Sequence, residues 1–383
     1  MHSGVGSYIG AAHQVAIGRN PRLLSGPERL YLDHAATTPV LPEAQAAMAN
    51  ALLVWANPSS PHGDGRQARA LLEDARKAVA HTLGWRHDVI FTSGASEALQ
   101  IVAARVKAER RIVGATEHDA VVAAMGPSAP ALRVDANGVI DMDVLADELS
   151  HGPALVAIQQ VNNETGVVQP LDRIYRRVRD SGSLLLADCA QGAGKLPLPD
   201  ADFIAISAHK LGGPPGVGAL LVKDLALLEA SGGQERGYRR GTENLPGIAA
   251  LAAALESRAF LVEMPRLAAL RQQLESEIAQ AGGVVIAEGA ERIATIGGYA
   301  MPSVASASQL VQLDLADISV SAGSACSSGS IKPSRVLAAM HAPAEVAASV
   351  IRVSFGPSTS GADVSRFLNA WRGIAERAKA RAA

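Results

Sequence analysis

Short apolar runs that alternate with helical patterns dominate the chain from about residue 31 to about residue 223. Most of the runs are apolar throughout rather than alternating, which is typical of strands that are buried on both faces of a sheet. Six runs are expected as strands: 88–92, 111–115, 154–158, 183–187, 202–207 and 217–222. Helices are expected between them, among others over 65–83 and 96–109. This alternation predicts an α/β domain with a mainly parallel sheet between layers of helices.

The last third of the chain has another pattern. A long helical stretch covers about 244–281, and Pro265 is expected to break it because proline lacks a backbone N–H. A final amphipathic helix is expected over about 363–380. Short strands are expected between these helices, around Val284, Thr295, Ile318 and Ile351. Short strands mixed with helices predict a second, smaller α+β domain.

We therefore divide the chain into three parts. Residues 31–255 are expected to form the large α/β domain, and residues 256–383 the small C-terminal α+β domain. Residues 1–30 are expected to be a leader that is disordered or binds a partner. This leader lacks the cationic start and apolar run of a signal peptide, so a cytoplasmic protein is expected.

Composition argues against several classes of function. Lys and Arg number 35 against 37 Asp and Glu, so no charge surplus favours nucleic acid or an anionic membrane surface. No apolar run reaches the length of a membrane span. The only cysteines are Cys189 and Cys326, which argues against a disulfide framework and fits a reducing compartment.

Lys210 stands where an apolar strand ends, in Ser207-Ala208-His209-Lys210, and glycines and prolines follow at once. A lysine in such a place can be partly desolvated, which lowers its pKa towards neutrality. Its free amine can then form a Schiff base with an aldehyde. A surface lysine is the common alternative, so the residues at the neighbouring strand ends have to decide.

Two other strand ends offer groups for a charged ligand. The run 88–92 ends at small residues before a helix begins; Ser93 or Ser96 can cap that helix, whose start can bind a phosphate. Asp188 lies at the carboxyl end of a buried strand, where open α/β sheets bind ligands. A buried carboxylate needs a cation, which can be a protonated pyridine nitrogen or an arginine.

His118 and Asn163 follow two further strands. The histidine can stack on a flat ring, act as an acid or base, or be structural. The amide of Asn163 can hydrogen-bond to a phenolic oxygen or a substrate, or only form a turn. Together the strand ends supply a phosphate site, a stacking ring, a carboxylate for a pyridinium and a Schiff-base lysine. One cofactor, pyridoxal 5'-phosphate, needs all of these groups.

With these residues in view, the sequence strongly resembles the cysteine desulfurases of the class V aminotransferase group. These are fold-type I pyridoxal phosphate enzymes. The match runs from about Tyr31 to the last helix and is carried by motifs at 31–39, 57–62, 116–118, 161–166, 188–191, 207–210, 232–237, 239–244, 324–329 and 351–354. The resemblance implies a large domain with a mainly parallel seven-stranded sheet between helices, and a smaller α+β domain.

The resemblance also implies roles for the matching residues. Lys210 matches the Schiff-base lysine, and His118 the histidine that stacks on the cofactor; Lys210 or His118 is expected to move the protons. Asp188 matches the partner of the pyridine nitrogen, and Gln191 the donor to the phenolic oxygen. The matches to phosphate ligands are the backbone of Ala95 and Ser96, the side chains of Ser96, Ser207 and His209, and Thr242 from the second subunit of a homodimer. The matches to substrate-binding residues are Asn163 and Arg352, with Arg352 on the carboxylate.

Cys326 lies in a run of small residues, 321–330, which is expected to be a mobile loop. The resemblance implies that L-cysteine gives its sulfur to Cys326 as a persulfide and leaves as L-alanine. Cys189, at an apolar strand end, is expected to pack in the core. The long loop resembles the group that delivers sulfur to an iron–sulfur scaffold or a carrier for tRNA thiolation, so an acceptor protein is an expected partner.

Two other interpretations stay open. A selenocysteine lyase or a small-amino-acid aminotransferase of class V would share the fold and the cofactor, but a transaminase needs no thiol at Cys326. A weakly active paralogue that mainly binds a sulfur-transfer partner is the other. Departures from the family pattern at residues 97–100, Pro215 and 356–358 suggest it.

Overall fold

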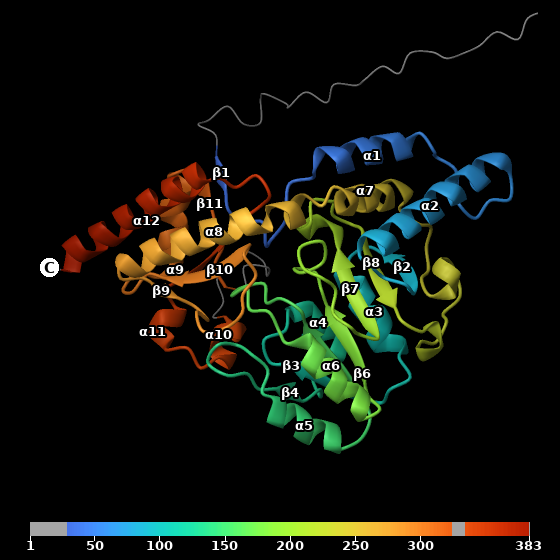
Figure 1. Cartoon of the computed structure of the whole chain (residues 1–383), viewed down its shortest axis with the longest axis horizontal. Coiled ribbons are helices and arrows are strands. Elements are labelled where there is room, and N and C mark those ends of the chain that lie inside the picture. Colours follow the sequence, from blue (N-terminus) through green and yellow to red (C-terminus); the bar gives the residue numbers. More distant parts are fainter. Residues whose placement is uncertain (1–28, 324–333, 383) are drawn as a thin grey trace, which may run out of the picture.

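The structure is a computed structural model that describes residues 29–323 and 334–382 (Figure 1). A large sheet with its helices lies beside a second group of elements that includes α8 (Ala259–Gln280) and α12 (Gly361–Ala382) (Figure 1). The active-site residues predicted above come from both groups.

The large sheet has seven strands in the order β2-β8-β7-β6-β5-β3-β4. Their bounds are β2 (Asp88–Thr92), β3 (Arg110–Gly114), β4 (Ala131–Leu132), β5 (Ala154–Gln159), β6 (Leu184–Asp188), β7 (Phe203–Ser207) and β8 (Gly218–Val222). The five strands β4, β3, β5, β6 and β7 run parallel to one another. Strand β8 is antiparallel to both of its neighbours, β7 and β2. The prediction of a mainly parallel seven-stranded sheet is therefore confirmed.

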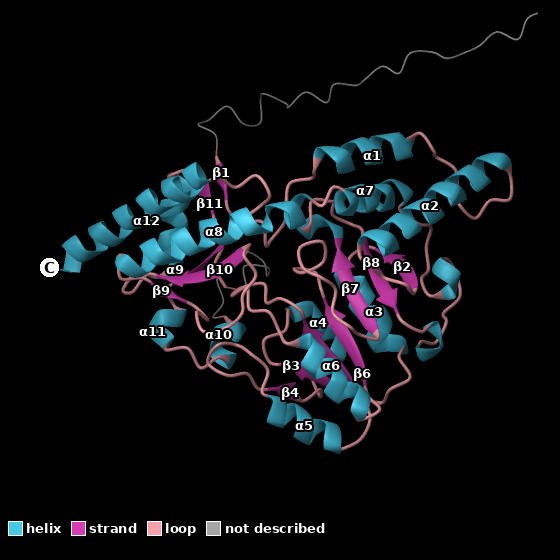
Figure 2. Ribbon diagram, viewed as in Figure 1, coloured by secondary structure: helices cyan, strands magenta, loops and turns pink. Residues whose placement is uncertain are grey.

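Helices cover both faces of this sheet (Figure 2). In β5, Val156 and Ile158 belong to one hydrophobic cluster and Leu155 and Ala157 to the other, because successive side chains point to opposite faces. The first cluster includes residues of α1 (Pro42–Leu52), α2 (Gly63–Thr82), α5 (Met142–Ser150), α6 (Leu171–Asp180) and α7 (Leu245–Glu256). The second includes residues of α3 (Ala95–Arg105) and α4 (Asp119–Met125). Burial on both faces explains why most residues of these strands are apolar.

The second group of elements has its own core. Its antiparallel sheet has the order β12-β10-β9, with β9 (Val284–Val285), β10 (Ile296–Ala300) and β12 (Val350–Ser354). The helices α8, α9 (Ser306–Leu315) and α12 pack in this core, whereas α10 (Arg335–Ala339) and α11 (Ala344–Ala347) pack against the core of the large sheet. The strand β1 (Leu30–Tyr31) pairs in parallel with β11 (Ile318–Ser319), and Leu30 and Leu32 share a hydrophobic cluster with Trp371. The chain around residue 32 is thus fastened to the C-terminal elements.

The predicted break at Pro265 is wrong, because Pro265 lies inside α8. The helical stretch breaks at Arg258, whose φ of 51° is left-handed. Residues of α7 pack in the core of the large sheet, whereas Phe260 of α8 packs in the second core. The helical stretch therefore breaks where the chain passes from the core of the large sheet to the second core. Of the described helices, no single one has the length and apolar composition to cross a membrane; α7 and α8 pass that test only as a pair bent by 48°.

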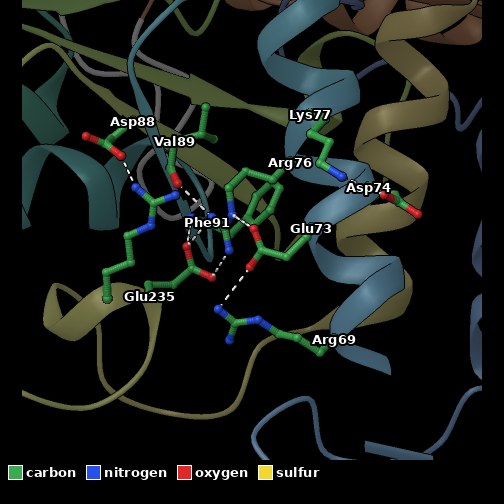
Figure 3. Close-up of polar contacts among 10 residues, drawn as sticks. Arg69, Glu73, Asp74, Arg76, Lys77, Asp88, Val89, Phe91 and Glu235 are labelled. Atoms are coloured by element: carbon green, nitrogen blue, oxygen red, sulfur yellow. Dashed lines mark hydrogen bonds and ion pairs between the residues drawn. The ribbon is translucent and has the colours of Figure 1, made fainter. Parts of the chain in front are cut away.

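A buried ion pair covers the free edge of β2 (Figure 3). The Glu235 carboxylate accepts hydrogen bonds from the Arg76 guanidinium at 2.7 and 3.0 Å, and from the backbone N–H of Phe91 at 2.8 Å. Arg76 also donates to the carbonyl oxygen of Val89 at 2.6 Å. The side chains of Arg76 and Glu235 are 8% and 1% exposed. The pair thus satisfies edge groups that a further strand would otherwise bond.

Substituting Arg76→Met is expected to lower the free energy of unfolding by about 3–5 kcal/mol, because Glu235 is left buried without its cation. The exposed pair of Lys77 with Asp74, on the same helix, provides the matched control. Substituting Lys77→Met should cost under about 1 kcal/mol. Urea unfolding of both variants measures the difference. Equal costs for the two variants would contradict this account of the β2 edge.

Candidate active site

A cavity of about 350 Å³ opens at the carboxyl ends of β5, β6 and β7 and at the start of α3. Parallel strands bring their carboxyl ends to one edge, so residues that follow different strands meet there. The predicted site residues that line the cavity are Ala95, Ser96, His118, Asn163, Asp188, Gln191, Ser207, His209 and Lys210. Thr242 and Arg352 are not among its lining residues.

Lys210 lies just after β7, in the short 3-10 helix η1 (Ala208–Lys210). Its Nζ donates a hydrogen bond to the carbonyl oxygen of Ala35 at 2.7 Å. The same oxygen accepts from Nε2 of Gln191 at 2.8 Å. The backbone N–H of Ala35 in turn donates to Oγ of Ser354, on β12, at 2.8 Å. The C-terminal elements therefore hold the carbonyl group that orients the lysine.

Asp188 is buried at the end of β6. Burial raises the pKa of its carboxyl group, while the N–H of Ala190 at 2.9 Å and the charges of His118 and Lys210 lower it in part. A cation placed against this carboxylate would stabilise its charged form.

His118 is the N-cap residue of α4, and its Nδ1 accepts the backbone N–H of Ala120 at 3.1 Å. This bond orients the ring at the cavity wall and leaves Nε2 to carry the proton of the neutral imidazole. The neighbouring Glu117 is buried, and burial raises the pKa of this carboxyl group well above its usual value. The backbone N–H of Gln159 donates to Glu117 at 2.9 Å.

The prediction that Ser93 or Ser96 caps α3 is wrong. The N-cap residue is Gly94, and among the described residues no side chain caps the helix. A Cβ on Gly218 would lie 2.7 Å from Cα of Gly94, so the turn packs closely on β8. The uncapped start of α3 faces the cavity, and such a start can bind an anion through its N–H groups.

The remaining predicted residues lie in other places. Arg352 is buried on β12 and donates to the carboxylate of Asp33 at 2.8 Å and to the carbonyl oxygen of Asn163 at 3.0 Å. It thus contacts a residue of the cavity wall while paired with an anion. Thr242 is exposed. Cys326 lies outside the described residues. Cys189 is fully buried in the core of the large sheet, as predicted.

Comparison with known proteins identifies the family. The family model of class-V aminotransferases matches residues 30–367. A cysteine desulfurase of Gluconacetobacter diazotrophicus is 34% identical over 371 residues, which cover 90% of this chain and 93% of that protein. The chain belongs to the cysteine desulfurases. Their cofactor, pyridoxal phosphate, fits the cavity, because the Lys210 amine, the buried Asp188 carboxyl group and the uncapped start of α3 all line it.

Two solved structures resemble this cysteine desulfurase. A NifS-like protein from Rickettsia africae ESF-5 has a TM-score of 0.84 and 27% identity, covering 91% of this chain and all of that chain (100%). SspA in complex with cysteine has a TM-score of 0.71 and 27% identity, covering 86% of this chain and 100% of that chain. The resemblance predicted from the sequence is confirmed.

Lys195, which was not predicted as a functional residue, is buried. Its Nζ lies 4.6 Å from the centroid of the Phe260 ring, a favourable place for a cation. Burial and the charge of Lys210 lower the pKa of Lys195 to about 7. Burial, together with the charges of these lysines, also lowers the pKa of His209 to about 4. A buried lysine four residues beyond Gln191 was not visible as a site residue because its environment comes from α8.

Substituting Lys195→Met is expected to change how stability depends on pH. The pKa of Lys195 falls from 10.5 to about 7 on folding, so between these values the unfolded chain holds a proton that the folded chain has lost. The stability of the unsubstituted protein therefore rises with pH over this window, and the variant lacks that contribution. The free energy of unfolding of the variant should exceed that of the unsubstituted protein most below about pH 7. This difference should disappear towards about pH 10. Urea unfolding across this range measures both slopes, and equal slopes would contradict the shift.

Proposed function

We propose that the protein converts L-cysteine to L-alanine and takes the sulfur onto Cys326 as a persulfide. The observation that carries the proposal is the cavity in which Lys210, Asp188 and the start of α3 meet. These groups are a nucleophilic amine, a carboxylate for a ring nitrogen and an anion site, and pyridoxal phosphate uses all of them.

Each end of the cofactor has residues to hold it in this proposal. Lys210 attaches it covalently, and Asp188 pairs with the ring nitrogen. His118 stacks on the ring, and the second amide hydrogen of Gln191 reaches the phenolic oxygen. The phosphate ligands are the N–H groups of Ala95 and Ser96 and the side chains of Ser96, Ser207 and His209. When bound, pyridoxal phosphate supplies an electron sink for the substrate carbon.

Arg352 and Asn163 hold the substrate. Arg352 uses one N–H of each Nη atom for Asn163 and Asp33, and its buried Nε has no hydrogen-bond partner among the described residues, so Nε is one of the donors left for a carboxylate. Asp33, which pairs with Arg352, keeps the guanidinium in place at the wall formed by Asn163. The cysteine bound to SspA supports cysteine as the substrate.

Sulfur transfer is a displacement at the substrate sulfur. The Cys326 thiolate attacks that sulfur, an S–S bond forms and the bond from Cβ to sulfur breaks. The electron pair stays with the carbon, which takes a proton and leaves as part of alanine. Lys210, held by Ala35, and Nε2 of His118 are the groups that carry protons at the cavity wall.

A second subunit and an acceptor protein complete the proposal. Thr242 is exposed and does not line the cavity of its own chain, which suits a residue that reaches the phosphate of the other subunit. The persulfide on Cys326 then passes to an acceptor protein for iron–sulfur clusters or thiolated products. The two cysteines, one of them in the core, suit a cytoplasmic enzyme.

Substituting Cys326→Ser is expected to reduce sulfide release from L-cysteine, measured with dithiothreitol as reductant, to background. The visible absorbance of the bound cofactor should stay unchanged, because Cys326 is not needed to hold it. Cys189→Ala, at the buried cysteine, is the matched control and should keep its turnover. Mass spectrometry should find one added sulfur on Cys326 and none on Cys189. Full sulfide release by the Cys326 variant would refute the proposal.

Substituting Lys210→Ala is expected to abolish the irreversible labelling of the protein by pyridoxal phosphate and borohydride. Reduction links the cofactor to the amine that holds it, so the labelled peptide identifies that amine. Lys223→Ala is the matched control, because Lys223 donates to the Tyr175 hydroxyl and does not line the cavity. A label that persists in the Lys210 variant would show that another amine holds the cofactor.

A further inference from the structure

One segment, residues 231–241, is fastened to the large sheet on both sides of the turn that begins α3. On the strand side, Glu235 accepts the N–H of Phe91 in β2 and pairs with Arg76 (Figure 3). On the helix side, Nε of Arg239 lies 3.1 and 3.3 Å from the carboxylate oxygens of Glu97. The turn at Ser93 and Gly94 lies between these two attachments.

Glu97 creates an electrostatic problem for a phosphate. It stands in the first turn of α3 and lines the same cavity as Ala95 and Ser96. A phosphate at the start of α3 would therefore approach a carboxylate, and like charges in a partly buried site repel. The backbone N–H of Ser93 donates to Glu97, and Arg239 supplies the positive charge that pairs with it.

The segment holds Arg239 in this position at the cost of an unfavourable backbone. Glu235 and Arg236 have left-handed φ values of 49° and 57°, which residues other than glycine rarely adopt. The N–H of Arg239 donates to the carbonyl oxygen of Gln234 at 3.3 Å, and Arg236 pairs with Asp88. The buried ion pair of Glu235 and the surface pair of Arg236 keep the segment in place against that strain.

We propose that Arg239 is a positioning residue for the phosphate of the cofactor. It neutralises Glu97 and holds the turn so that the N–H groups of α3 meet a phosphate monoester without repulsion. Arg76 and Glu235 support it by fastening the same segment to β2. The inference rests on the proposed function, because it takes the cavity as the cofactor site.

The test compares ligands with and without the phosphate. Dissociation constants of pyridoxal phosphate and of pyridoxal are measured by equilibrium dialysis on cofactor-free protein. Arg239→Gln should weaken pyridoxal phosphate binding by about 10-fold or more, because it unmasks one nearby charge. Pyridoxal binding should change by less than about 2-fold, because pyridoxal lacks the phosphate that the unmasked charge repels. Adding Glu97→Gln to this variant should restore pyridoxal phosphate binding to within about 3-fold of the unsubstituted protein, because the unpaired charge is then gone.

Two controls separate charge from folding. Arg239→Lys keeps the charge and should keep most of the affinity. Arg240→Gln changes the exposed neighbour, whose guanidinium donates to the carbonyl oxygen of Ser231, and should leave both constants within about 2-fold, since that charge is screened by solvent. The inhibition constant of inorganic phosphate, measured by its competition with pyridoxal phosphate, should be higher for Arg239→Gln than for the unsubstituted protein.

Equal losses for both ligands in Arg239→Gln would overturn the inference, and so would a failure of Glu97→Gln to restore binding. Either result would show that Arg239 only stabilises the local structure. Failure of the proposed function has another signature. In that case the unsubstituted protein itself would not bind pyridoxal phosphate or become labelled at Lys210. Binding by the unsubstituted protein together with unchanged binding by Arg239→Gln would overturn only this inference.

Discussion

The carbonyl oxygen of Ala35 is the point on which the site depends. It accepts hydrogen bonds from Lys210 and Gln191, which lie 175 and 156 residues away in the chain. Ser354 on β12 holds the N–H of the same residue. A long lysine side chain has many rotamers, so a fixed acceptor is what gives its amine one position. The position of the Lys210 amine therefore requires both hydrophobic cores to be folded and in contact.

Charge is divided along the cavity. Lys210 and the start of α3 make one part attractive to an anion, and Asp188 makes another part attractive to a cation. A cofactor with a phosphate at one end and a ring nitrogen elsewhere matches both parts. Glu97 is the exception to this pattern, and Arg239 compensates its charge. The electrostatic design thus needs residues that touch no ligand.

Much of the fold and the rim of the site follows from local pattern. The apolar runs were predicted as strands within about a residue of their ends, because burial on both faces leaves a plain hydrophobic signal. The residues just after those strands line one cavity, because parallel strands end at a common edge. Local pattern failed where packing decides. Pro265 continues a helix, and Gly94 stands at the N-cap of α3, where a serine was expected.

The sequence by itself determined the order of the strands and helices along the chain, the identity of the groups at the strand ends, and the family. Tertiary structure decided which groups meet. The pairing of Arg239 with Glu97 spans 142 residues, and that of Arg76 with Glu235 spans 159. No local or periodic sequence pattern predicts either pair, because the contacts form only when the loop packs against the folded sheet. The burial of Lys195 likewise depends on Phe260 from a helix of the other core, and desolvation exists only once both cores have packed.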